Sequence, residues 1–424
     1  MAAVSAIETQ RTVEAVWRIE SARLVAGLAR MTHDIDAAEE LAQEALVAAL
    51  QQWPQSGVPD NPGAWLMSVA KRRAIDEFRR QQRFERKVAE LGRDLEHDAW
   101  QQPEPDLDRI DGGIEDDLLR LVFTACHPVL PTEARVALTL RLLGGLSTGE
   151  IARAFLAPEP TVAQRIVRAK KTLAKKQIPF EVPRGEELAP RLASVLEVIY
   201  LIFNEGYSAT AGDDWMRPEL CAEALRLARV LAGLANAEPE VHGLVALLEI
   251  QASRSRARVG ADGEPVLLLD QNRARWDQLL IRRGLAALDR AESLTDEPGP
   301  YQLQAAIAAC HARARRPEDT DWHRIAALYE ELAVVNPSPV VELNRAVAVS
   351  MADGPAAGLQ LVDELRDEPA LRNYHLLPSV RGDLLAKLGR HGEARAEFDH
   401  AAALTGNERE RALLLDRARQ ARGS

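Results

Sequence analysis

Cysteine is nearly absent from this sequence, which holds only Cys126, Cys221 and Cys310 in 424 residues. An odd number at wide spacing excludes a disulfide framework and leaves no CxxC pair for a metal. Long apolar runs are also missing, because stretches such as residues 195–203 fall far short of the roughly 18–20 residues that a bilayer span needs. The N-terminus has no basic segment leading into an apolar run. We therefore expect a cytoplasmic protein that binds no metal and no other cofactor.

Lysine is scarce and unevenly distributed, since six of the seven lysines lie in the first 176 residues. Residues 71–87 hold eight Lys/Arg and three acids, and residues 161–176 hold six Lys/Arg and no acid. Residues 90–117, between them, hold eleven Asp/Glu and two Arg. A single charge run is usually a solvated face. Two basic segments around an acidic one instead indicate nucleic-acid contact, despite the net charge of -11.

The length exceeds the roughly 250–300 residues at which one hydrophobic core stops growing, so two or three domains are expected. Hydrophobic residues make up 46% and charged residues 28%, which is typical of folded, water-soluble proteins. Apolar residues recur at helical spacing, as in Ala38, Leu41, Ala42, Ala45 and Ala49. The sequence therefore predicts an all-α fold.

Turn and capping residues divide the first half into helices. Trp53-Pro54 predicts the end of one helix, residues 55–61 form a loop, and Asn61-Pro62 begins a second helix that extends to Arg80. Residues 91–113 show no periodicity and form a linker. Further helices are expected at residues 118–125, 133–143, 147–155 and 161–176.

The last two of these helices, joined by a short turn at residues 156–160, have the outline of a helix-turn-helix. Ser147 and Glu150 have the spacing of a capping box. A stripe of apolar residues in the second helix (Val162, Ile166, Ala169 and Leu173) leaves its polar residues on other faces. Any helical hairpin with a basic surface would also give this pattern.

Four sequence strings carry a family resemblance: AEELAQEAL from Ala38, NPGAWLMSVAKRRAIDEFRR from Asn61, LSTGEIARAF from Leu146 and TVAQRIVRAKKTL from Thr161. In order and spacing they resemble bacterial RNA polymerase sigma factors of the extracytoplasmic-function (ECF) type. YLIFNEGYSA from Tyr200 and LLLDQNRARWD from Leu267 resemble the subgroup with a long helical C-terminal extension.

The resemblance implies a role for specific residues. The residues expected to bind core polymerase are Glu39, Glu40, Gln43 and Glu44. The residues expected to bind the promoter minus-ten element are Asn61, Lys71, Arg72, Arg73, Asp76, Arg79 and Arg80. The residues expected to read the minus-thirty-five element are Thr161, Gln164, Arg165, Arg168 and Lys171. Cations that hold single-stranded backbone, and Gln or Arg at the start of a recognition helix, suit these tasks chemically.

Several features remain open between two interpretations. Trp65 is either an aromatic partner for an unstacked base or, as we favour, a core residue. The acidic linker either lies in the RNA channel of the polymerase or is a solvated tether. Cys126 and His127, in a junction that departs from the family pattern, have no second Cys/His pair nearby, so we expect a buried structural role.

The second half is predicted to be a degenerate array of helical hairpins. Ala386, Gly389, Ala394, Phe398 and Ala401 follow the tetratricopeptide pattern, and residues 322–337 form a weaker copy. Such arrays present a concave surface for a protein or small-molecule partner.

The extension also contains a polar cluster around a tryptophan, and its members are Asp270, Arg273, Arg275, Trp276 and Asp277. The resemblance implies a regulatory or structural role, with salt bridges or an internal docking face. An enzyme would use Asp270 and Asp277 as a carboxylate pair, but no nucleophile, metal-ligand set or phosphate loop accompanies them.

The predicted organisation is a sigma domain two at residues 10–88, an acidic linker at 89–114, a helix-turn-helix sigma domain four at 115–180, and a regulatory extension at 186–424. The expected function is a non-enzymatic promoter-specificity subunit with core RNA polymerase and promoter DNA as partners. A polymerase-independent DNA-binding regulator and a helical-repeat enzyme or scaffold are the alternatives.

Overall fold

The protein is seen in a computed structural model, which describes residues 2–91, 114–155, 157–208, 216–260 and 265–421. Most of the residues in these ranges lie in helices. In the described ranges there is no strand, and Val259 and Pro265 form an isolated β-bridge. The predicted all-α fold class is therefore confirmed.

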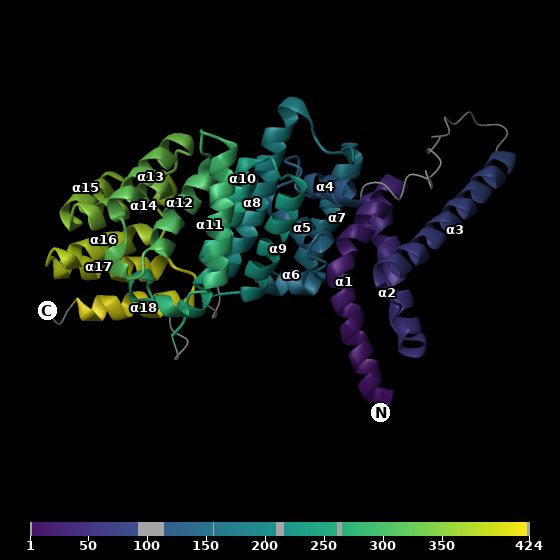
Figure 1. Cartoon of the computed structure of the whole chain (residues 1–424), viewed down its shortest axis with the longest axis horizontal. Helices are drawn as coiled ribbons and strands as arrows, with labels where there is room; N and C mark the ends of the chain where they lie inside the picture. Colours follow the sequence, from purple (N-terminus) through teal and green to yellow (C-terminus); the bar gives the residue numbers. More distant parts are fainter. Residues whose placement is uncertain (1, 92–113, 156, 209–215, 261–264, 422–424) are drawn as a thin grey trace. The chain divides into compact units, whose positions relative to one another are not determined.

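The helices divide between two compact units, residues 1–198 and 199–424. The helices that begin in the first unit are α1 (Ala2–Thr32), α2 (Ile35–Ser56), α3 (Pro62–Leu91), α4 (Ile114–Ala125), α5 (Thr132–Leu142), α6 (Thr148–Ala154), α7 (Glu159–Lys175) and α8 (Leu188–Tyr207). Those that follow are α9 (Pro218–Leu234), α10 (Pro239–Ser253), α11 (Gln278–Leu294), α12 (Pro300–Arg313), α13 (Trp322–Val335), α14 (Pro339–Ala352), α15 (Pro355–Glu364), α16 (Leu376–Lys387), α17 (His391–Leu404) and α18 (Glu408–Gln420) (Figure 1).

Helix α2 buries an alanine stripe and begins at an Asp34 cap, whose side chain accepts a hydrogen bond from the Asp36 amide at 2.7 Å. The prediction that Trp53-Pro54 ends this helix is wrong, because α2 continues to Ser56 with Pro54 inside it. The helix ends where Gly57 adopts a φ of 81°, a conformation that favours glycine.

Helix α3 begins as predicted, since the Asn61 Oδ1 atom accepts a hydrogen bond from the Ala64 amide at 3.0 Å and Pro62 is the first helical residue. It does not stop at Arg80 but continues to Leu91. The reason is local, because residues 81–91 contain good helix formers and neither Gly nor Pro. The predicted acidic linker falls almost wholly on residues 92–113, outside the described residues.

Helices α4 to α7 occur close to the four predicted segments. The capping box is confirmed: the Ser147 amide donates to Glu150 Oε2 at 2.8 Å, and the Glu150 amide donates to Ser147 Oγ at 3.2 Å. The predicted stripe of α7 is also confirmed, because Val162, Ile166, Ala169 and Leu173 are its buried residues. A helix-turn-helix results.

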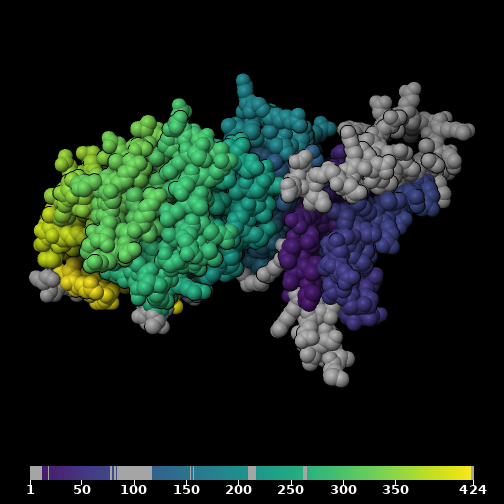
Figure 2. Space-filling model, in the orientation of Figure 1, coloured from purple at the N-terminus to yellow at the C-terminus, as the bar shows by residue number. Residues whose placement is uncertain are grey.

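In the second unit, neighbouring helices pack as successive pairs, such as α10 with α11, α13 with α14 and α16 with α17. Their side chains form a continuous packed surface on the face shown in Figure 2. In the predicted tetratricopeptide-like segment, Ala394, Phe398 and Ala401 are buried and Gly389 makes the turn with a φ of 75°. The hairpin predicted there is confirmed.

Candidate nucleic-acid interface

The polar face of α7 is exposed. All five residues expected to read bases or phosphates on this helix are exposed, and they are Thr161, Gln164, Arg165, Arg168 and Lys171. They lie opposite the buried stripe that holds α7 on the helix-turn-helix core. Neither Arg165 nor Arg168 forms an ion pair with a residue that the structure describes. This face therefore has the charge and the exposure that a major-groove contact requires.

Lys170, on another face of α7, is occupied within the protein. Its Nζ atom lies 2.9 Å from Glu39 Oε2 on α2 and also bonds Asp36. Arg141 on α5 contacts the same carboxylate, with its Nε atom 2.5 Å from Glu39 Oε1. Burial alone would lower the pKa of Lys170, but its bonds to Asp36 and the charge of Glu39 raise the pKa above the usual value. We call the group Asp36, Glu39, Arg141 and Lys170 the α2–α7 clasp.

The residues expected to bind polymerase therefore differ in exposure. Glu39 is only 8% exposed, because Arg141 and Lys170 cover it. Glu40 is exposed, and Gln43 and Glu44 are half-buried. The sequence did not indicate Arg141 or Lys170 as partners of Glu39, since a contact across about a hundred residues leaves no local pattern.

The basic face of α3 contains side chains in different environments. Arg72, Asp76, Arg79 and Arg80 are exposed, whereas Lys71 and Arg73 are half-buried. Arg73 forms an ion pair of 2.7 Å with Glu44 of α2. This pair connects a residue that we expect to bind DNA with one that we expect to bind polymerase.

Aromatic packing supports the start of this helix. Trp65 is half-buried, and its ring lies 5.3 Å from that of the fully buried Trp53, edge to face. This contact agrees with the favoured interpretation of Trp65 as a core residue. Asn61, which we expect to bind DNA, caps α3, because its Oδ1 atom accepts a hydrogen bond from the Ala64 amide.

The first turns of α8 pack against residues 125–135, the junction that departs from the family pattern. Ser194 Oγ donates to the Cys126 carbonyl at 2.5 Å, and Arg135 donates to Ser194 Oγ at 2.5 Å and to Glu197 Oε2 at 2.9 Å. Burial raises the pKa of the Cys126 thiol to about 11 and lowers the pKa of His127 to about 4. Cys126 is 1% exposed, so the burial expected for this residue is confirmed.

The five residues of the polar cluster in the extension differ in burial. Arg273 and Trp276 are buried, with the guanidinium carbon 5.1 Å from the ring centre, whereas Asp270, Arg275 and Asp277 are exposed. Asp277 caps α11 by accepting from the Leu279 amide at 2.9 Å. The predicted salt bridges are wrong for the described residues: Arg273 instead donates to the carbonyls of His311 and Ala314.

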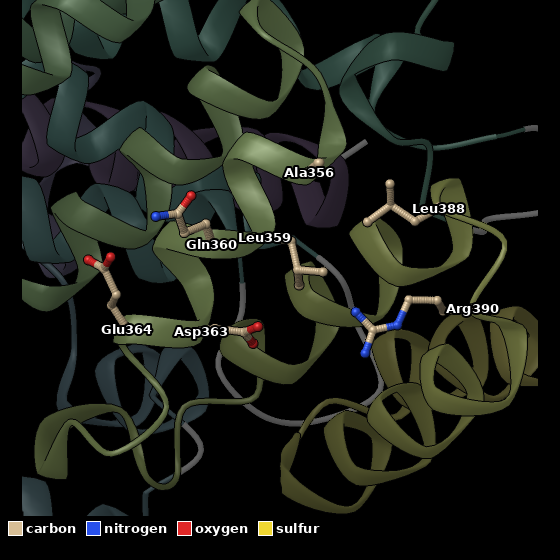
Figure 3. A pocket seen from close by; sticks show the side chains of 7 residues that line it. All are labelled: Ala356, Leu359, Gln360, Asp363, Glu364, Leu388 and Arg390. Carbon is tan, nitrogen blue, oxygen red and sulfur yellow. The ribbon is translucent and has the colours of Figure 1, made fainter.

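A shallow pocket of about 580 Å³ lies elsewhere in the extension, between α15 and the turn that joins α16 to α17 (Figure 3). Two of the charged residues that line it already have partners, because Asp363 pairs with Arg381 and Arg390 pairs with Glu393. Among the described residues, no group of three or more His, Cys, Asp or Glu is arranged to hold a metal ion. No helix within those same ranges is long and apolar enough to span a membrane.

Comparison with known families decides the identity. Sigma-70 region 2 matches residues 19–84, and sigma-70 region 4 matches residues 120–173. The chain therefore carries regions 2 and 4 of the sigma-70 family. A family of unknown function, DUF6596, matches residues 191–292 of the same chain.

Two relatives extend the comparison. Uncharacterized protein R00370 of Rhizobium meliloti is 48% identical over 388 residues, which is 91% of this chain and 90% of the relative. The "Probable ECF RNA polymerase sigma factor SigI" of Mycobacterium tuberculosis is 29% identical over 175 residues, covering 40% of this chain and 57% of the relative. No solved structure matches the chain significantly.

Proposed function

We propose that this sigma factor binds core RNA polymerase through α2, opens the minus-ten element with α3 and reads the minus-thirty-five element with α7. The observation that carries this proposal is the presence of sigma-70 regions 2 and 4 in one chain. The exposed polar face of α7 and the exposed Arg79 and Arg80 of α3 support it. A polymerase-independent regulator would have no use for region 2.

The α2–α7 clasp adds a step to polymerase binding. Glu39 is covered by Arg141 and Lys170, so a polymerase surface that contacts Glu39 must first displace these cations. Exposed Glu40 is available without any rearrangement. We propose that Glu40 makes the first contact and that Glu39 becomes available when the clasp opens.

Co-purification with core polymerase, followed by transcription from a promoter library, tests the proposal. Glu40→Ala should weaken polymerase binding because it removes an exposed carboxylate at the proposed contact. Gln52→Ala, at an exposed position of the same helix, is the matched control. Equal polymerase binding by both variants and the wild type would remove Glu40 from the proposed role.

We further propose that the C-terminal extension controls the activity of the sigma regions. The Rhizobium relative supports this, because 388 aligned residues must include most of the extension as well as the sigma regions. A chain ending at Tyr207 keeps the contacts of Ser194 and Glu197 with Arg135. Its run-off transcription should differ from that of the full chain, and identical transcription at matched helicity would contradict the proposed control.

A further inference from the structure

One large apolar side chain of the region 4 segment remains exposed. Of the described residues between 117 and 180, Val167 alone among the large apolar residues lies open to solvent, with 46% of its surface exposed. The other large apolar residues of α7, which are Val162, Ile166 and Leu173, are buried. A single exposed valine is ordinary on a protein surface, so its position on the helix decides whether it has a role.

Val167 lies within the polar face of α7. Because a helix has 3.6 residues per turn, positions 164, 167, 168 and 171 face the same side. Gln164, Arg168 and Lys171 are exposed, and none of them belongs to the buried stripe. Val167 therefore lies among the side chains that we expect to bind the minus-thirty-five element.

A valine at this position does not favour the helix. A β-branched side chain loses χ1 freedom in a helix, so valine stabilises an exposed helical position less than alanine does. Ala174, at another exposed position of α7, shows that this helix accepts alanine at its surface. The exposed part of the valine also contributes no burial free energy. A contact outside the folded chain therefore explains Val167 better than the stability of α7 does.

We propose that Val167 determines base specificity by packing against the C5-methyl group of a thymine in the minus-thirty-five element. Thymine is the base that presents a methyl group in the major groove, where apolar side chains contact it. Arg168 and Lys171 beside Val167 favour an anionic partner, so the occupant is DNA rather than an apolar protein surface. The inference rests on the proposed role of α7 and adds a residue that reads a base by apolar contact.

Uracil substitution tests the contact, because deoxyuridine lacks only the methyl group of thymidine. Promoters are selected from a library with core polymerase, and each thymine of the minus-thirty-five element is then replaced by deoxyuridine. For the wild type, one replacement should weaken promoter binding about fourfold, which is the effect of one buried methyl group. For Val167→Ala, promoters with thymine and with uracil at that position should bind equally.

Lys175→Ala is the matched control, because Lys175 is exposed at the end of the same helix. This variant should weaken binding but keep the wild-type difference between thymine and uracil. Val167→Ala should unfold at the same temperature as the wild type or slightly higher, since alanine favours a helix, so its lost discrimination cannot come from unfolding. The uracil replacements in the wild type keep the test decisive if Val167→Ala folds poorly.

The outcomes separate this inference from the proposed function. If no uracil replacement weakens wild-type binding, or if Val167→Ala keeps the wild-type preference for thymine over uracil, the methyl contact is overturned. The role of α7 still stands in that case when Arg165→Ala alters the base preference. If the complex with polymerase shows no base preference anywhere in the minus-thirty-five element, the proposed function fails as well.

Discussion

Glu39 Oε2 accepts a hydrogen bond from Lys170 Nζ at 2.9 Å, across 131 positions of the sequence. The contact links α2, in the segment that matches sigma-70 region 2, to α7, in the segment that matches region 4. Arg141 binds the second oxygen of the same carboxylate. Glu39 thus contacts two cations of the region 4 segment, and Asp36 contacts one of them, Lys170.

Glu39→Gln should destabilise the first unit by about 1–3 kcal/mol, because it leaves two partly buried cations without their shared charge partner. Urea denaturation of the full chain measures the effect. The control is Glu40→Gln, an identical change at the exposed neighbouring residue, which should alter the free energy of unfolding by about 0.5 kcal/mol or less. Equal effects of the two substitutions would show that the clasp does not form in solution.

Arg165→Ala should weaken recognition of the minus-thirty-five element at particular bases, by about 1–3 kcal/mol for a bidentate contact. The exposed Arg165 lies near the start of α7, whereas Lys175 lies exposed at its end. Lys175→Ala is therefore the control, and any loss it causes should be uniform across promoter sequences. The measurement is transcription with core polymerase from a randomised upstream element. An unchanged base preference for Arg165→Ala would remove it from base recognition.

The double substitution Arg79→Ala with Arg80→Ala should impair strand opening more than closed-complex formation. The reason is that single-stranded backbone must be held by cations once the bases separate. Permanganate reactivity of unpaired thymines measures opening, and electrophoretic mobility measures complex formation. Normal permanganate reactivity in the double variant would contradict the assignment of these arginines to the minus-ten element.

Cys126 should resist alkylation in the native protein at neutral pH. Its pKa is raised to about 11, so at pH 8 only about one molecule in a thousand carries the reactive thiolate. Because the pKa is raised, reactivity should increase as the pH approaches that value. Mass spectrometry after iodoacetamide treatment measures modification, with urea-unfolded protein as the reference. Rapid native modification at pH 7.5 would contradict the burial of this thiol.

Local sequence patterns predicted most of the sigma helices. The Ser147–Glu150 capping box, the Asn61-Pro62 start of α3 and the apolar stripe of α7 depend on residues within one or two turns, so the sequence alone determines them. Helix ends were less predictable. Pro54 does not end α2, because the proline ring fixes φ at a helical value and the last turn continues until the Gly57 amide donates to the Trp53 carbonyl.

Long-range contacts were not predictable from the sequence. The partners of Glu39 lie 102 and 131 positions away, and Arg135 binds Ser194 across 59 positions. The polar cluster shows the same limit within the extension. Arg273 and Trp276 turn inward while Asp270 and Arg275 turn outward, and neither composition nor spacing distinguishes the two groups. Folding also brings the Arg254 guanidinium carbon to 5.8 Å from the Trp276 ring centre.

The central claim is that this protein recognises promoters as part of RNA polymerase. Footprinting of a promoter selected from a library, with protein alone, with core polymerase alone and with both, tests it most directly. We predict specific protection and transcription only when both are present, at physiological salt. Tight, specific protection of the same site by the protein alone would contradict the account and favour a polymerase-independent regulator.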